Sequence, residues 1–120
     1  MASYSKIELS GSTDGRGILI DEDAPAGKTV HTGSATATTY DEVWIYAANY
    51  DSSDRKLTIE WGSASAGDLI EVTIPTEAGL VLVVPGLIIK GNASTALEVR
   101  AFAATTSAIQ LFGYVNQIAA

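Results

Sequence analysis

Hydrophobic and polar positions alternate with a period of two residues along most of this 120-residue chain. This alternation is typical of β-strands, in which successive side chains point to opposite faces of a sheet. It is clearest over residues 42–49, where one face carries Val43, Ile45 and Ala47 and the other carries Trp44, Tyr46 and Ala48. No segment has the three-to-four-residue spacing of a long amphipathic helix, so the pattern predicts an all-β chain.

Clusters of small and polar residues divide the pattern into short strands about ten residues apart. Pro75 is expected to end a strand, and Pro85-Gly86 to separate two others, because proline cannot donate a hydrogen bond to a neighbouring strand. The turn at 51–54 is predicted to join its flanking strands as a hairpin. Strands are expected at 6–9, 18–20, 28–32, 42–49, 56–61, 68–74, 80–84, 87–89, 96–103 and 109–118.

Nine or ten short strands at this spacing predict an antiparallel β-sandwich of jelly-roll type. We expect residues 1–120 to form one domain, because no linker or repeat divides the chain. Residues 1–9 are expected to be an N-terminal arm or an edge strand.

The composition and the net charge narrow the range of binding partners that we expect. The net charge is −7, and the seven Lys and Arg residues are dispersed, so no basic stripe is available for phosphates and direct nucleic-acid binding is not expected. A negative net charge is repelled by nucleic acid, which fits a protein on the outside of a particle that encloses nucleic acid. It fits an ordinary acidic cytosolic protein equally well. No signal-like segment or membrane-spanning run is present, so we expect synthesis in a cytoplasm and no membrane partner.

Residue types that build catalytic or metal centres are scarce. There is no cysteine, and His31 is the single histidine, which excludes a multi-histidine metal centre and leaves His31 as a strand or rim residue. The acidic segment 21–23 is interpreted as a solvated turn rather than a cation site. Glu60, Glu71 and Glu98 are expected to face solvent or to form ion pairs. We therefore predict no enzyme activity, catalytic residue, cofactor or metal.

The aromatic residues near the centre of the chain have two interpretations. Trp61 is in phase with Leu57 and Ile59 and is expected in the core. Trp44 and Tyr46 lie on the opposite face of their strand from Val43 and Ile45. That face is either the second layer of the sandwich or an exposed patch, in which case the candidates for a ligand surface are Trp44, Tyr46 and Tyr50.

Two regions, 80–89 and 109–118, are apolar on both faces of the expected strand. In an antiparallel monomer one face normally meets water, so two-sided apolar strands favour a homo-oligomer. The candidates for an oligomer or partner interface are Leu80, Leu82, Leu87, Ile89, Leu111, Phe112 and Tyr114.

Several segments resemble small structural proteins encoded in the morphogenesis clusters of tailed bacteriophages. They are Gly11–Ile20, Ala24-Pro-Ala-Gly27, Val30-His31-Thr32, Leu57–Gly62, Val84-Pro-Gly-Leu87 and Gly113-Tyr-Val-Asn116. These segments are turn-and-strand signatures, so the resemblance carries over no functional residue.

The resemblance implies a head decoration (cement) protein on the outer capsid surface of the virion. Its expected partners are further copies of itself, as a trimer, and the major capsid protein. Two alternatives stay open: a carbohydrate- or receptor-binding jelly roll of a tail fibre, and a head–tail connector or tail component.

Overall fold

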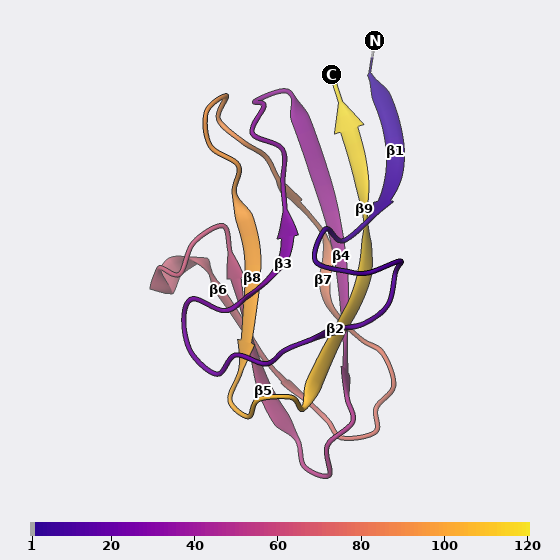
Figure 1. Cartoon of the computed structure of the whole chain (residues 1–120), viewed down its shortest axis with the longest axis vertical. Coiled ribbons are helices and arrows are strands. Elements are labelled where there is room, and N and C mark those ends of the chain that lie inside the picture. The colour runs from indigo at the N-terminus through magenta and orange to yellow at the C-terminus, as the bar shows by residue number, and fades with distance from the viewer. Residues whose placement is uncertain (1) are drawn as a thin grey trace.

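A computed structural model describes residues 2–120 of the chain, and Met1 lies outside the described residues. Over this range the chain forms nine β-strands and one short 3₁₀ helix (Figure 1). The elements are β1 (Ser3–Glu8), β2 (Ile18–Leu19), β3 (Lys28–Thr32), β4 (Thr39–Asn49), β5 (Arg55–Trp61), η1 (Ala66–Asp68), β6 (Leu69–Ile74), β7 (Val81–Ile89), β8 (Glu98–Ala103) and β9 (Ile109–Ala119).

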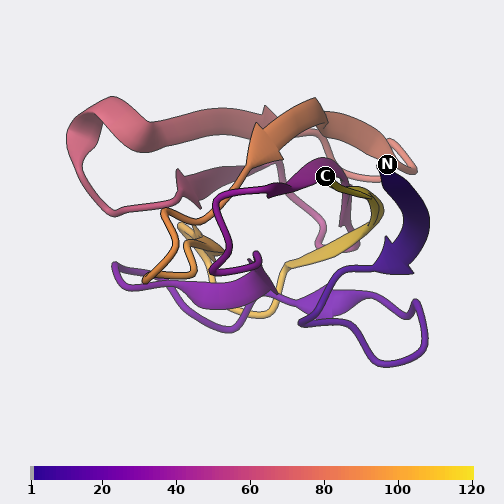
Figure 2. The ribbon, with the colours of Figure 1, turned by 90° about the horizontal axis from the view of Figure 1, so that it is seen from above.

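The strands form two antiparallel sheets packed face to face, which confirms the predicted all-β sandwich. We call the five-stranded sheet, with the order β1-β9-β4-β7 and β2 beside β9, sheet A. The four-stranded sheet, with the order β3-β8-β5-β6, is sheet B. Figure 2 views the molecule along its long axis, with the strands around the core and the two termini close together. Ser3 pairs with Ala119, so residues 3–8 form an edge strand.

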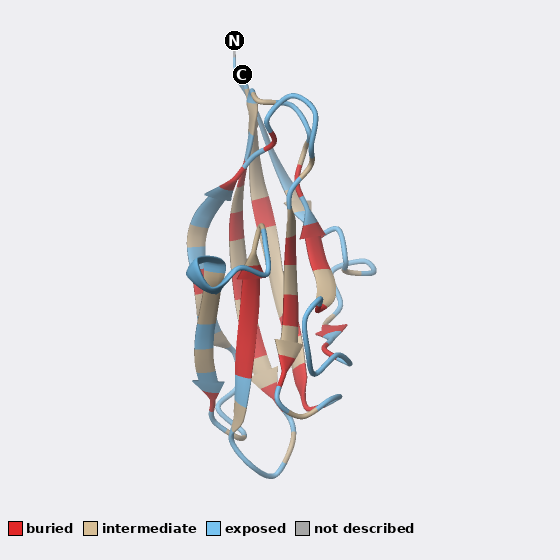
Figure 3. Ribbon diagram, turned by 90° about the vertical axis from the view of Figure 1, so that its left-hand side faces the viewer, coloured by how far each residue is buried: buried red, intermediate tan, exposed pale blue. Residues whose placement is uncertain are grey.

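Inward-facing side chains of both sheets form one apolar core. Buried positions alternate along the strands with partly exposed ones, as Figure 3 shows. Sheet A contributes Val43, Ile45, Ala47, Val84, Ile89, Ile109, Leu111 and Val115, and sheet B contributes Val30, Leu57, Ile59, Ile74, Val99, Ala101 and Ala103. Trp61 packs against this core, as its phase with Leu57 and Ile59 predicts.

A buried polar bridge connects the two sheets inside this core. His31 on β3 and Asp41 on β4 are 2% and 1% exposed, and His31 Nε2 lies 2.7 Å from Asp41 Oδ2. Because the backbone N–H of Ser10 donates to His31 Nδ1, the ring proton is on Nε2, which donates to Asp41. Gln117 on β9 donates to the other Asp41 oxygen at 3.0 Å. His31 is therefore a satisfied core residue.

The predicted hairpin around residues 51–54 is wrong. β4 lies in sheet A and β5 in sheet B, so this turn crosses between the sheets, and β5 pairs with β6 and β8 instead. Alternation shows which residues of a strand face the core, but two strands that face the same core can be neighbours or can lie in opposite sheets.

Residues 81–89 form one strand rather than two. Pro85 and Gly86 lie within β7, an edge strand of sheet A, where a missing N–H donor is tolerated. The β4–β7 register shifts on either side of the Trp44–Pro85 pair, between Val43 and Trp44 and between Ile45 and Tyr46. The strand thus absorbs the proline as an irregularity.

The core position of Leu111 leads to a stability prediction. Leu111 is fully buried, so Leu111→Ala should lower the free energy of unfolding by about 2–5 kcal/mol through lost burial and a cavity. Leu80→Ala, at a side chain that is 60% exposed, should change it by about 0.5 kcal/mol or less. Urea unfolding measures both, and equal losses would contradict the assigned core.

Candidate functional site

The outer face of sheet A, which points away from sheet B, is unusually apolar. Strand register arranges its side chains in rows that run across β1, β9, β4 and β7. The rows are Tyr4–Ile118–Tyr40, Lys6–Asn116–Glu42–Ile88, Glu8–Tyr114–Trp44–Pro85 and Phe112–Tyr46–Leu82. An exposed sheet face of a sandwich is normally polar, so these rows make this outer face the candidate site.

The centre of this face is an aromatic pair held in a fixed orientation. The rings of Trp44 and Tyr114 are nearly parallel, with an interplanar angle of 12° and centroids 6.1 Å apart. Lys6 Nζ lies 4.7 Å from the centroid of the Tyr114 ring, in a cation–π contact. Because Gly86 has no side chain, the Trp44 indole can lie close against β7.

Glu42 holds the polar edge of the same cluster. One of its carboxylate oxygens, Oε1, accepts hydrogen bonds from Trp44 Nε1 at 2.7 Å and from Asn116 Nδ2 at 3.0 Å. These hydrogen bonds, that of Asn116 first and that of Trp44 second, lower the pKa of Glu42. The face therefore keeps a negative charge beside its aromatic centre at neutral pH.

A hollow of about 410 Å³ lies at the end of this face nearest the chain termini. It is lined by Tyr4, Ser5, Lys6, Glu42, Asn116, Gln117 and Ile118. Lys6, Glu42 and Asn116 were not predicted as site residues. The two-residue period of the strands could have indicated Glu42 and Asn116, because each lies two residues from an aromatic residue and so on the same face of its strand.

The predicted interface residues separate into two groups. Leu80, Leu82 and Leu87 are 60%, 45% and 40% exposed, and Phe112 and Tyr114 are partly exposed on the outer face. Ile89 and Leu111, which were candidates for the same interface, are 4% and 0% exposed and lie in the core of the single chain. Both strands have apolar residues on both faces, and the sequence does not show which face meets the other sheet.

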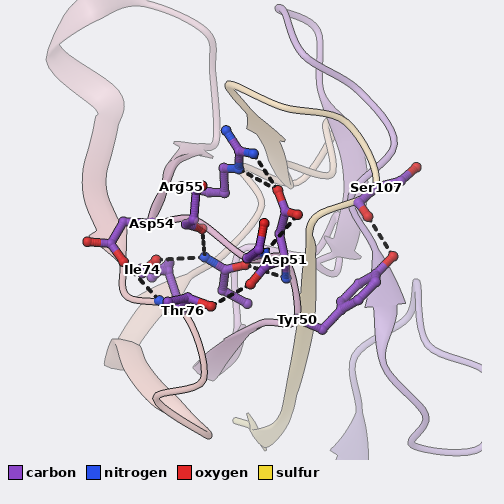
Figure 4. Close-up of polar contacts among 10 residues, drawn as sticks. Tyr50, Asp51, Asp54, Arg55, Ile74, Thr76 and Ser107 are labelled. Carbon is purple, nitrogen blue, oxygen red and sulfur yellow. Dashed lines mark hydrogen bonds and ion pairs between the residues drawn. The ribbon is translucent and has the colours of Figure 1, made fainter.

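The three predicted ligand-surface residues do not form one cluster. Trp44 and Tyr46 lie on the outer face, which settles the choice between a second core layer and an outward patch. Tyr50 follows the end of β4, about 20 Å along the chain from Trp44. Its hydroxyl donates to the carbonyl of Ser107 at 2.5 Å, as Figure 4 shows, which ties the β4–β5 turn to the β8–β9 turn.

The β4–β5 turn beside Tyr50 contains a dense polar network (Figure 4). Arg55 donates to Asp51 Oδ2 from Nε at 2.6 Å, and its Nη2 lies 2.5 Å from the same oxygen. Asn49 donates to the carbonyls of Ser53 and Ile74. These contacts are made with the backbone of the turn itself and with neighbouring strands. We therefore interpret the network as one that stabilises the connection between the two sheets.

The acidic residues singled out in the sequence do not assemble a metal centre. Within residues 2–120, no group of three or more His, Cys, Asp or Glu side chains is placed to hold a metal ion. Asp21 pairs with Lys28 at 3.8 Å, Glu71 with Lys56 at 2.5 Å, and Glu98 with Arg100 at 3.1 Å. Glu60 is the exception to the predicted solvent exposure, because it is 1% exposed.

Comparison with known proteins identifies no relative of this chain. No protein-family model matches the chain, and no match to it is found among curated proteins or solved structures. Over the described residues, none of the helices has the length and apolar character needed to cross a bilayer.

The turn network predicts how stability depends on pH. The backbone N–H of Ser52 and the Arg55 side chain lower the pKa of Asp51 in the folded state. Its stabilising contribution is therefore fully present above the unfolded-state pKa, about 4, and is lost as pH falls through the lower folded-state pKa. Between about pH 5 and pH 2, the melting temperature of Asp51→Asn should fall less steeply with decreasing pH than that of the wild-type protein. Asp23→Asn, at an exposed residue, should leave the slope unchanged, and an identical slope in Asp51→Asn would refute the assignment.

Gly86 offers a direct test of the aromatic pair. A Cβ at this position would lie 2.9 Å from Trp44 Cζ2, and the backbone φ of +78° disfavours other residues. Gly86→Ala should cost about 1–3 kcal/mol and change the near-ultraviolet circular dichroism of Trp44. Gly79→Ala is the matched control, with φ +71° and open space around its Cβ. It should cost stability without altering that spectrum, and an unchanged spectrum in both variants would contradict the packing.

Proposed function

We propose that this chain is a non-enzymatic structural protein of a tailed-bacteriophage virion. In this role it binds the outer capsid surface as a head decoration protein, as a homotrimer, and stabilises the shell. The observation that carries the proposal is the apolar, aromatic outer face of sheet A. The sequence resemblance to phage structural proteins supports the choice of a virion partner.

The contrast between the two outer faces supports protein docking through sheet A. The outer face of sheet B is mainly polar, with Thr29, Lys56, Thr58, Glu60, Glu71, Thr73, Glu98 and Arg100 among its side chains. Aromatic residues are enriched in protein interfaces, and charged residues are depleted from interface cores. The rows of sheet A fit that composition, since charge is confined to Lys6, Glu8 and Glu42.

We further infer that the sandwich is a jelly roll. The strand pairs are nested: β5 pairs with β6, β4 with β7, β3 with β8, and β2 with β9. A long antiparallel hairpin that is rolled up produces such nesting, with successive strands passing between two sheets. The jelly roll is an architecture of viral capsid and lectin domains, and it is compatible with a virion role.

In this proposal the two partner types use neighbouring parts of the molecule. Leu80, Leu82 and Leu87 on or beside β7 contact the next copy of the chain, and the aromatic centre and the hollow near β1 contact the major capsid protein. Many identical weak contacts on a shell add through multivalency, so each need not be strong alone. The acidic net charge keeps unassembled protein soluble and away from nucleic acid.

A carbohydrate-binding role on a tail fibre is the second candidate. The Trp44–Tyr114 pair with Glu42 and Asn116 beside it provides an aromatic surface and polar groups that a sugar ring would use. We rank it second because the apolar rows continue over four strands, beyond what one sugar ring would cover.

The proposal is tested by mass and by binding to shells. Light scattering of the wild-type protein should give three times the 12.5 kDa chain mass, and the protein should co-sediment with capsids that lack a decoration protein. Leu82→Glu should reduce the mass toward that of the monomer and weaken co-sedimentation, because it buries a charge in the interface.

The matched control is Thr73→Glu, at an exposed position on the outer face of sheet B. It should assemble and bind as the wild type does. Melting curves of both variants confirm folding. A wild-type monomer that ignores shells but binds immobilised glycans, with binding lost in Trp44→Ala, would reject decoration in favour of the carbohydrate-binding role.

A further inference from the structure

One oxygen of the Glu42 carboxylate is occupied and the other is open. Oε1 accepts hydrogen bonds from Trp44 Nε1 at 2.7 Å and from Asn116 Nδ2 at 3.0 Å. Oε2 has no hydrogen-bond partner within residues 2–120. It is also not buried, because Glu60 Oε2 is the one buried side-chain oxygen or nitrogen without a partner over that range. The two bonds to Oε1 fix the carboxylate and leave Oε2 as an acceptor that is open to solvent.

No cation of the protein itself neutralises this carboxylate. In the part of the chain that the structure describes, none of the ion pairs includes Glu42. Lys6 is the cationic residue of the outer-face rows, and it lies two strands away from Glu42 with Asn116 between them. Its Nζ lies over the Tyr114 ring. The rows also contain Glu8, so their one positive charge is outnumbered by two negative charges.

Glu42 lines the hollow of about 410 Å³ at the end of the face nearest the termini. Asn116 lines the same hollow, and its Oδ1 accepts no hydrogen bond from the described residues. Tyr4, which is 75% exposed, and its neighbour Ile118 add apolar surface to the wall. The hollow therefore combines a fixed carboxylate, two open acceptors and an accessible aromatic ring.

Covering this face would change the environment of Glu42. In the free protein water solvates the carboxylate, and an exposed ion pair there would contribute little. The hydrogen bonds from Asn116 and Trp44 keep the pKa of Glu42 below its usual range, so the carboxylate enters an interface as an anion. A charge that is removed from water without a counter-charge costs much free energy. A partner that covers the face must therefore supply a cation.

We propose that the hollow binds the guanidinium group of an arginine side chain presented by the partner protein. This assignment depends on the proposed docking through sheet A and specifies one contact within it. A guanidinium has five N–H donors in a planar fork, so it can donate to Glu42 Oε2 and Asn116 Oδ1 together and stack on the Tyr4 ring. A lysine ammonium is more strongly hydrated and has no plane to stack. Glu42 would repel a carboxylate, and a neutral amide would leave its charge unpaired.

The first experiment titrates the ¹⁵N-labelled wild-type protein with Nα-acetyl-arginine amide. The indole N–H of Trp44 is the reporter, because it donates to Glu42, and that of Trp61, which packs against the core, is the internal reference. The side-chain N–H resonances of Trp44 and Asn116 should shift saturably, with a dissociation constant of about the millimolar range for so small a ligand. The Trp61 resonance should not move.

Two probes of similar size are the controls. Nα-acetyl-lysine amide should bind at least about threefold more weakly, because its ammonium is more strongly hydrated and cannot stack. Nα-acetyl-glutamine amide, which is neutral, should cause no saturable shift. Absence of the shifts with the arginine probe, or equal affinity for the lysine or glutamine probe, would overturn the proposal.

Variants test the role of the carboxylate. Glu42→Gln should weaken binding of the arginine probe about tenfold or more, because it removes the charge and keeps an acceptor for Trp44. Glu8→Gln is the matched control, at an exposed glutamate of the same face, and should retain the wild-type affinity within about twofold. Wild-type affinity in Glu42→Gln would place the arginine elsewhere.

Lys6→Gln keeps the test valid if Glu42→Gln fails to fold. It removes the cation that lines the same hollow, so the arginine probe should bind about twofold or more tightly. Unchanged or weaker binding in Lys6→Gln would contradict a cation site beside Glu42.

Binding to shells separates failure of this proposal from failure of the proposed function. Capsids that lack a decoration protein should bind Glu42→Gln more weakly than they bind the wild-type protein and Glu8→Gln. Equal binding of all three proteins would reject the arginine contact and leave docking through sheet A standing. Shells that ignore a wild-type protein whose hollow still binds the arginine probe would reject the decoration role and leave the arginine site standing.

Discussion

The pairing of β4 with β9 at the centre of sheet A is the constraint on which the rest of the structure depends. All eleven residues of β4 pair antiparallel with β9, from Thr39–Ala119 to Asn49–Ile109. A shift of one residue would exchange the faces of every side chain on one of these strands. Gly113 contributes to this register, because a Cβ there would collide with the carbonyl oxygen of Trp44.

This one register determines both faces of the sheet. Inward it places Val43, Ile45 and Leu111 in the core, and it brings Gln117 to Asp41 and so completes the polar bridge to His31. Outward it places Trp44 next to Tyr114, and Glu42 next to Asn116. The stability of the sandwich and the composition of its candidate docking face are consequences of the same ladder.

Local patterns in the sequence predicted the strands but not their partners. The predicted bounds of β3 are correct and those of β5 and β6 differ by one residue, because Pro75 and small-residue turns flank regular alternation. Three features were not predicted from the sequence: the crossing between the sheets at 51–54, the continuity of β7 through Pro85, and the burial of Glu60. Each depends on contacts between distant segments, as in the Gly27–Glu60 hydrogen bond, which local alternation does not encode. Some apolar residues of the outer face, such as Leu82, Phe112 and Tyr114, were among the candidates, but Ile89 and Leu111 could not be separated from them without knowing which face meets sheet B.

The central claim is that the outer face of sheet A becomes covered when the protein assembles. The two tryptophans lie on different faces, so Trp61→Phe leaves Trp44 as the single fluorescent reporter on that face. Acrylamide quenching of Trp44 should be measured for dilute protein and again after binding to capsids that lack a decoration protein. The account predicts strong quenching in the dilute protein and clear protection in the assembly. Equal quenching in dilute and shell-bound protein would contradict it.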